Sequence, residues 1–413
     1  MLHPDFVKPD YQANCFSRIP KTIQYLLTGD GALSLPENLF EKVGTRFDQV
    51  IFFLVDAFGW QFFERYRDKY PFFQHFLDSG QVARLDSQFP STTAAHVTTI
   101  HTGLPVGQSN VFDWQYYEPK LDAIFAPLLY STAGTRSRET LKSVKISPAE
   151  IIPSQTLYQD LKSAGVQSYI FQHRAFTPST FSNVVFNGAA VHPYKTLSEA
   201  LVNMGETVSN CSSPAYTFFY FSPLDDICHQ YGPDSPQFEA EVDAFFTTLE
   251  NQFFNQLAGN LKNTLFIMTA DHGQTAVDPA TTIYLNQDPD LIGFQKFIRS
   301  NREGRFIIPG GSCRNMIIYL KEGVQEEAHA FLSKRLQGKA EVYSVRALID
   351  EGLFGDRPVT PGFIERAGDL MILPFKNESV WWYEKGRFEQ RFYGHHGGLT
   401  PEEVQIPFLM HPF

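Results

Sequence analysis

The chain has 413 residues, enough to bury a large core, and its acidic residues outnumber its basic residues by 45 to 34, for a formal charge of −11. A molecule with this charge repels the backbone of DNA or RNA, so we expect a small substrate and no nucleic-acid polymer as partner. The sequence begins without a basic segment and apolar stretch of the secretory type, and no apolar run approaches the roughly 20 residues that cross a bilayer. The four cysteines form neither a CxxC pair nor a dense framework, which fits a reducing compartment. We therefore expect a cytoplasmic protein without a membrane partner, and the sequence leaves its oligomeric state open.

Continuous apolar runs predict the strands of a buried sheet. They lie at Gln49–Val55, Gln167–Phe171, Ala215–Phe221 and Thr264–Ala270, with helix-like stretches between them at Pro71–Ser79, Ser154–Ala164 and Ser235–Leu257. Runs that are apolar on both faces are typical of parallel strands covered by helices. This βαβ order predicts an open α/β sandwich.

The segment from about residue 275 to 392 is less regular. Strand-like Arg314–Leu320 and Asp369–Leu373 alternate there with Gly-rich and Pro-rich turns. We therefore predict a core formed by residues 1–274 and 393–413, and a cap or insertion formed by residues 275–392.

Polar residues follow several of the predicted strands. Asp56 follows the first run, Asp225 follows the third, and Asp271 with His272 follows the fourth. The carboxyl ends of parallel strands line one crevice, so these side chains are expected to meet there. Each aspartate alone is equally well explained as a turn or helix-capping residue, but the three together indicate a shared site.

Two histidine segments are compatible with a metal site. Asp225 and His229 are one helical turn apart, and carboxylate oxygen and imidazole nitrogen are good zinc ligands. The alternative is that Asp225 or Asp226 caps a helix while His229 faces solvent. Adjacent His395 and His396 in a Gly-rich loop supply a third ligand only if the fold brings the two segments together.

The hydroxyl-rich segment Phe89–Gly103 contains a candidate nucleophile. Thr92 and Thr93 stand where the pattern changes to a helix, and a helix N-terminus attracts phosphate. Helix capping is the commoner role for such a residue. A threonine needs a base or a metal to act as a nucleophile, and because neither a GxSxG elbow nor a Walker P-loop is present, we expect a metal.

Five segments, in this order, resemble the type I phosphodiesterase/nucleotide pyrophosphatase family of the alkaline-phosphatase superfamily. They are LVDAFG, FPSTTAAHVTTIHTG, SPLDDICHQYGP, TADHGQT and GHHGGLTPEE. The resemblance implies an alkaline-phosphatase-like sandwich with a mostly parallel sheet and a smaller cap. It also implies a hydrolase of a small phosphodiester or pyrophosphate of the nucleotide type.

The same resemblance implies two divalent metal ions, with zinc as the favoured element. It assigns one ion to Asp225, His229 and His396, and the other to Asp56, Asp271, His272 and the Thr93 oxygen. The proline and the Thr-Gly pair that bracket the motif both identify Thr93 as the nucleophile, which would form a phospho-threonine intermediate. Thr92 is the alternative.

The chain departs from the family pattern at several positions. Ala57 and Cys228 replace glycines, and Ala94 and His96 stand where nucleotide pyrophosphatases often carry Phe and Asn. His96 is therefore predicted to bind a phosphate oxygen of the substrate, with a structural histidine as the alternative. Base stacking would fall to other aromatic side chains, for which the candidates are Phe112, Trp114 and Tyr116, unless the substrate is not a nucleotide.

Three other functions remain open from the sequence. A phosphomonoesterase would need extra positive charge, and no arginine is near Thr93 in sequence, although Arg174, Arg314 or Arg391 could arrive through the fold. A phosphonoacetate-type hydrolase of the same superfamily would also use a threonine. A non-catalytic metal-binding protein would have no need of the Thr93 hydroxyl.

Overall fold

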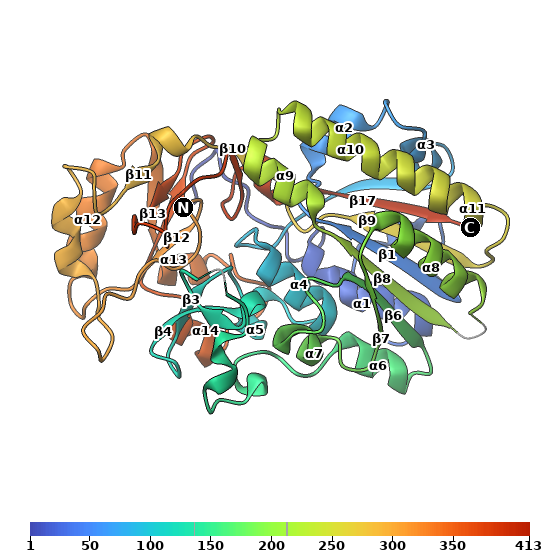
Figure 1. Cartoon of the computed structure of the whole chain (residues 1–413), viewed down its shortest axis with the longest axis horizontal. Coiled ribbons are helices and arrows are strands. Elements are labelled where there is room, and N and C mark those ends of the chain that lie inside the picture. Colours follow the sequence, from blue (N-terminus) through green and yellow to red (C-terminus); the bar gives the residue numbers. More distant parts are fainter. Residues whose placement is uncertain (136, 212–213) are drawn as a thin grey trace.

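The structure is a computed structural model that describes residues 1–135, 137–211 and 214–413. Its centre is a seven-stranded sheet with the order β2-β17-β9-β1-β8-β6-β7 (Figure 1). The strands are β1 Gln49–Val55, β2 Gln81–Asp86, β6 Gln167–His173, β7 Ala190–Tyr194, β8 Ala215–Phe221, β9 Thr264–Thr269 and β17 Gln405–Pro412. Neighbouring strands are parallel except where β17 pairs with β2 and β9.

Helices cover both faces of this sheet, which explains why its central strands are apolar throughout. On one face lie α1 Ile19–Thr28, α4 Thr93–Thr102 and α6 Leu157–Ser163; on the other lie α2 Trp60–Tyr66, α3 Pro71–Asp78, α8 Leu197–Ser209 and α10 Pro236–Leu249 (Figure 1). Every residue of β8 and β9 is buried, as is every residue of β1 except Gln49. The predicted α/β sandwich with a mostly parallel sheet is confirmed. No helix among the described residues combines the length and apolar character needed to cross a membrane.

Three strands of the sheet, β2, β7 and β17, are not among the strands predicted from the sequence. Pro407 lies within β17, between two neighbouring strands, and proline has no N–H to donate to a ladder. Its carbonyl oxygen instead accepts a hydrogen bond from the Thr269 hydroxyl at 2.6 Å. A proline inside the run therefore concealed a strand that lies next to β9.

A second lobe is built on a three-stranded antiparallel sheet with the order β12-β14-β13 (Figure 1). Its elements are β12 Met316–Ile318, α12 Gln325–Arg335, β13 Ala340–Ser344, α13 Val345–Asp350, α14 Pro361–Arg366 and β14 Leu370–Pro374. Another small antiparallel sheet, formed by β3 Tyr116–Glu118, β4 Ala123–Ala126 and β5 Ser131–Thr132, lies against α14 through a buried ion pair of Glu118 and Arg366 at 2.6 Å. All strands of the main sheet fall within residues 1–274 and 393–413, and the division into core and cap stays a prediction.

Candidate active site

Three adjacent strands bring the predicted acidic residues to one edge of the sheet. Asp56 follows β1, Asp271 and His272 follow β9, and Asp225 lies in α9 (Pro223–Tyr231), just after β8. Because β1 lies between β8 and β9, these strand ends are neighbours. His272 Nε2 is 3.3 Å from Asp271 Oδ2 and 3.5 Å from Asp56 Oδ1. The three side chains form one buried group.

Asp225 is the centre of a second group beside the first. His229, one turn further along α9, has its Nε2 at 3.4 Å from Asp225 Oδ2. His396 comes from the C-terminal Gly-rich loop, and its Nε2 is 3.8 Å from Asp225 Oδ1. The rings of His272 and His396 stack with centroids 3.6 Å apart. The fold therefore places the distant Gly-His-His-Gly loop beside Asp225, as the predicted site requires.

The two candidate threonines have different surroundings. Thr93 is the first residue of α4, and its Oγ1 is 3.2 Å from His272 Nε2. Thr92 is 1% exposed, and its hydroxyl is 3.5 Å from the Phe112 carbonyl oxygen. Of the two, Thr93 is the one whose hydroxyl reaches His272 Nε2, the nitrogen that lies next to Asp56 and Asp271.

A backbone carbonyl group fixes the orientation of each of the three imidazole rings. Nδ1 of His229 is 2.7 Å from the Gly394 oxygen, Nδ1 of His272 is 3.1 Å from the Gly273 oxygen, and Nδ1 of His396 is 2.8 Å from the Ser91 oxygen. A carbonyl oxygen only accepts, so each Nδ1 carries the proton and each Nε2 presents a lone pair to the carboxylates. Burial lowers the pKa of His229 to about 4 and that of His272 to about 3, which keeps these two rings neutral. Metal-binding histidines are commonly held in this way.

The carboxylates also have the properties of ligands. Asp56 Oδ1 and Asp271 Oδ2 are buried and have no hydrogen-bond partner among the described residues. Burial raises the pKa of Asp56, Asp225 and Asp271, and the charge of Asp271 raises those of the other two further. Unpaired buried carboxylate oxygens are costly, and a divalent cation would satisfy them. Candidate ligand atoms lie within 4.8 Å of one another in two sets, Asp56–Asp271–His272 and Asp225–His272–His396.

Ala57 occupies one of the positions where the family pattern has glycine. Its φ is 61°, in the left-handed region that costs a non-glycine residue about 1 kcal/mol or more. In this conformation its backbone N–H donates to Asp271 Oδ1 at 3.1 Å. The strained backbone therefore orients Asp271 so that Oδ2 is left for another partner.

Asp56, Thr93, Asp225, His229 and His396 line a cleft of about 550 Å³. Among the aromatic candidates for base stacking, Trp114 lines the cleft and is 42% exposed, whereas Phe112 and Tyr116 are completely buried. Phe176 and Phe392 also line it, and neither was anticipated from the sequence. Of the three candidates, only Trp114 is in a position to contact a substrate.

The predicted substrate-binding role of His96 does not fit its surroundings. The ring is completely buried, with Nδ1 at 2.8 Å from the Thr92 oxygen. Its Nε2 accepts from the backbone N–H of Gln88 at 2.8 Å and also lies 2.8 Å from the Ser87 hydroxyl. Both nitrogens are therefore occupied by protein groups. These contacts favour the alternative, a structural histidine that supports the first turn of α4.

The structure also distinguishes among the three arginines that were candidates for binding the substrate phosphate. Arg314 is completely buried, and its Nε and Nη2 donate to the two carboxylate oxygens of Glu403 at 3.0 and 2.9 Å. Arg174 is not among the residues that line the cleft, whereas Arg391 lines it and forms an ion pair with Glu389. Arg314 is therefore a structural residue.

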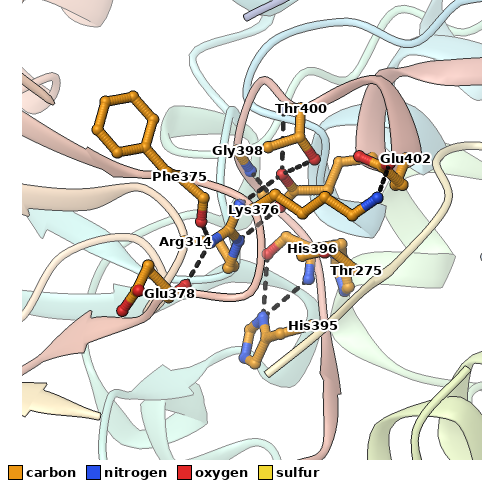
Figure 2. A network of polar contacts seen from close by, with 12 residues as sticks. Thr275, Arg314, Phe375, Lys376, Glu378, His395, His396, Gly398, Thr400 and Glu402 are labelled. Carbon is orange, nitrogen blue, oxygen red and sulfur yellow. Dashed lines mark hydrogen bonds and ion pairs between the residues drawn. The ribbon is translucent and has the colours of Figure 1, made fainter. Parts of the chain in front are cut away.

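The Arg314–Glu403 pair holds the loop that carries His396. Figure 2 shows Arg314 within a network that includes His396, Gly398 and Thr400. Glu403 Oε1 accepts from the Gly398 N–H at 3.0 Å, and Glu403 Oε2 accepts from the Thr400 hydroxyl at 2.8 Å. The network connects the second lobe to the end of the chain that delivers His396.

We expect Glu403→Gln to destabilise the protein by about 3 kcal/mol or more, because the Arg314 charge would stay buried without a counter-charge. Lys376→Met is the matched control, since it removes the Lys376–Glu402 pair of the same network, in which Lys376 is 59% exposed. That change should cost less than about 1 kcal/mol. Chemical denaturation of the two variants measures the difference, and equal losses would contradict the proposed importance of the buried pair.

Two further site residues were not predicted. Tyr220 in β8 donates a hydrogen bond to Asp56 Oδ2, and the Gln274 amide donates to Asp225 Oδ1 at 2.5 Å. Tyr220 lies inside an aromatic run, where nothing distinguishes it from a core residue. Gln274 is two residues after His272, and only its place within the TADHGQT segment could have indicated it.

The sequence model of the type I phosphodiesterase/nucleotide pyrophosphatase family matches residues 50–399. No protein of curated function matches the chain significantly in sequence.

Among solved structures, murine ectonucleotide pyrophosphatase/phosphodiesterase 5 is 18% identical with a TM-score of 0.64, and the match covers 88% of each chain. Its inactive variant in complex with AMP is 17% identical with a TM-score of 0.63, over 88% of this chain and 87% of that chain. Phosphonoacetate hydrolase from Sinorhizobium meliloti 1021, in complex with phosphonoacetate, is 17% identical with a TM-score of 0.62, over 88% of this chain and 89% of that chain. These structural matches support the alkaline-phosphatase-like fold.

Proposed function

The chain belongs to the type I phosphodiesterase/nucleotide pyrophosphatase family and is a hydrolase, and we propose that it cleaves a small phosphodiester or pyrophosphate through Thr93. One observation carries this proposal. The Thr93 hydroxyl lies 3.2 Å from His272, beside two buried carboxylate oxygens that have no hydrogen-bond partner among the described residues. A hydroxyl that must be activated is thus next to groups suited to bind cations.

The side chains fit two divalent ions, with zinc as the favoured element because the donors are carboxylate oxygen and imidazole nitrogen. His272 belongs to both sets of nearby ligand atoms, but its single Nε2 lone pair serves one ion. We assign His272 to the set that contains Asp56, Asp271 and Thr93. The other set then consists of Asp225, His229 and His396. When bound, the ions would lower the pKa of the Thr93 hydroxyl and offset the negative charge of the phosphate.

In the first half of the reaction, Thr93 Oγ1 attacks phosphorus while the bond to the leaving oxygen breaks. The Thr93 proton ends on the leaving group, which departs as an alcohol or a phosphate, and the phospho-threonine keeps the other ester group of the substrate. In the second half, water attacks phosphorus, the bond to Oγ1 breaks, the threonine hydroxyl is restored, and the phosphate monoester leaves. Thr93 is suited to this task because it begins α4, where free backbone N–H groups attract the phosphate oxygens.

The arginines favour a diester over a monoester. A monoester carries an additional negative charge, but Arg314 is neutralised by Glu403. Of the three described arginines that line the cleft, Arg387 and Arg391 are paired with neighbouring glutamates, and Arg138 lies over the Phe176 ring at 5.3 Å. We expect bis(4-nitrophenyl) phosphate to be hydrolysed at least about tenfold faster than 4-nitrophenyl phosphate, a difference of about 1.4 kcal/mol in activation free energy. Side-by-side values of kcat/KM test this expectation, and a faster monoester would overturn it.

Phosphonoacetate belongs in the same assay because a protein of similar fold binds it. Release of phosphate from phosphonoacetate, without cleavage of either nitrophenyl ester, would favour the carbon–phosphorus hydrolase alternative. A zinc-loaded protein that hydrolyses none of these compounds, nor a panel of nucleotides and dinucleotides, would favour the non-catalytic alternative. The cytoplasmic location stays a prediction.

A further inference from the structure

One face of α4 extends the cleft away from the proposed nucleophile. Thr93, Val97 and His101 are spaced four residues apart, and all three line the cleft. Residues at this spacing lie on one face of a helix. With a rise of 1.5 Å per residue, His101 is about 12 Å from Thr93 along the helix axis. His101 is therefore too far away to contact phosphorus, but it lies where a remote part of the substrate would reach.

His101 is buried, yet one of its ring nitrogens has no hydrogen-bond partner among the described residues. The residue is 2% exposed, and its Nδ1 is 2.6 Å from the Tyr158 hydroxyl. Nε2 has no hydrogen-bond partner among the described residues. The contrast with His96 is informative, because His96 lies on the same helix and has both of its nitrogens occupied.

The contact with Tyr158 fixes which nitrogen carries the proton. Tyr158 is completely buried, and within the described parts of the chain its hydroxyl is bonded to His101 alone. A buried hydroxyl donates its hydrogen where it can, so Tyr158 donates to Nδ1 of His101. The remaining proton of the neutral ring is then on Nε2. His101 consequently offers an N–H donor to the cleft.

The walls near His101 are apolar, and the donor is uncharged. The Phe186 and Phe218 rings meet His101 edge to face at 4.8 and 4.7 Å, and Val97, Leu129, Phe181 and Phe186 are among the residues that line the cleft. Burial lowers the pKa of His101 to about 3, so the imidazole is neutral near pH 7. A flat or apolar group that carries an uncharged acceptor fits these surroundings better than a second phosphate does.

We propose that His101 is a specificity-determining residue whose Nε2–H binds a neutral acceptor, a carbonyl oxygen or ring nitrogen, on the substrate's ester group about 12 Å from the nucleophile. The substrate class is thus a phosphate ester with a long, flat and largely apolar group that ends in such an acceptor. The inference rests on the proposed function for the position of the phosphate. It predicts that the far end of the ester group contributes to affinity through one hydrogen bond.

Binding measurements on the zinc-loaded full chain test this proposal without requiring turnover. Thymidine 5′-monophosphate carries carbonyl acceptors on its base, and methyl phosphate carries none. His101→Phe keeps an aromatic ring but removes the donor, so it should weaken binding of the thymidine nucleotide about five- to tenfold, the effect of one neutral hydrogen bond. Binding of methyl phosphate should stay within about twofold. His101→Gln restores a side-chain N–H and should recover most of the affinity.

Ile100→Val is the matched control, since Ile100 is a buried neighbour on α4 that does not line the cleft. The proposal is overturned if His101→Phe weakens both ligands equally or neither, if Ile100→Val reproduces the selective loss, or if the wild type binds both ligands equally. A selective loss in a protein that hydrolyses no ester would support this site and refute the proposed hydrolysis. Unchanged binding in a His101→Phe variant that does hydrolyse diesters would support the proposed hydrolysis and refute this site.

Discussion

The Thr93→Ala variant is expected to lose at least about 1,000-fold in kcat/KM for bis(4-nitrophenyl) phosphate, about 4 kcal/mol in activation free energy, while it retains the metal content of the wild type. Alanine removes the attacking oxygen but leaves the other proposed ligands in place. Thr93 is only partly buried and begins α4, so the loss of its hydroxyl should not disturb the helix. Steady-state kinetics and metal analysis of the same preparation measure both expected results.

Thr92→Val is the matched control for this variant. Thr92 makes no side-chain capping hydrogen bond to α4, and valine has nearly the same shape. We expect its activity to stay within about tenfold of the wild type, because a buried hydroxyl with one weak contact contributes little. The reverse result, with activity kept in Thr93→Ala and lost in Thr92→Val, would move the nucleophile by one residue.

Acid quenching during turnover provides an independent measurement. The wild type should carry a phosphoryl group on the peptide that contains Thr93, and Thr93→Ala should not. Thr93→Ser keeps a hydroxyl at this position and should retain part of the activity. A variant without Thr93 that still accumulates a phospho-enzyme would contradict the proposed intermediate.

The central strands could be predicted from sequence because their burial on both faces leaves a continuous apolar run. The same strands made the convergence of Asp56, Asp225 and Asp271 predictable, since it depends only on which polar residues follow each parallel strand. β17 was concealed for the opposite reason. Proline is uncommon inside a strand, so Pro407 conceals β17 in the sequence. In the structure, the Pro407 carbonyl oxygen accepts a hydrogen bond from the Thr269 side chain of the neighbouring strand β9.

Environments that depend on tertiary contacts were not predictable. His96 and His101 are five residues apart on one helix, yet only the folded chain shows their different contacts. His96 has both nitrogens bonded, whereas one nitrogen of His101 has no partner among the described residues. Trp114 likewise differs from Phe112 and Tyr116 only in the direction that its side chain takes in the fold. The sequence shows which residue types are present, whereas the neighbours that give each residue its role come from distant segments of the chain.

Removal of divalent ions is expected to abolish hydrolysis and to lower the thermal stability of the protein. Without cations, the buried carboxylates of Asp56 and Asp271 and the partly buried carboxylate of Asp225 repel one another, and two of their oxygens have no partner among the described residues. Ions that bind only the folded chain stabilise it by about 4 kcal/mol at a thousand times their Kd. Dialysis against a chelator, followed by thermal unfolding and activity assays, measures both effects. Zinc added back should restore them.

The stoichiometry distinguishes the two proposed sets of ligands. We expect about two ions per chain, because in-line displacement between paired metals uses one on each side of phosphorus. His229→Ala should remove one of them, since it changes only the set built on Asp225, and Asp56→Asn should weaken the other. His192→Ala is a suitable control, because His192 lies in the edge strand β7 and does not line the cleft. If His229→Ala and His192→Ala retain the same number of ions, His229 is not a ligand; full activity in the chelated wild type would refute metal dependence itself.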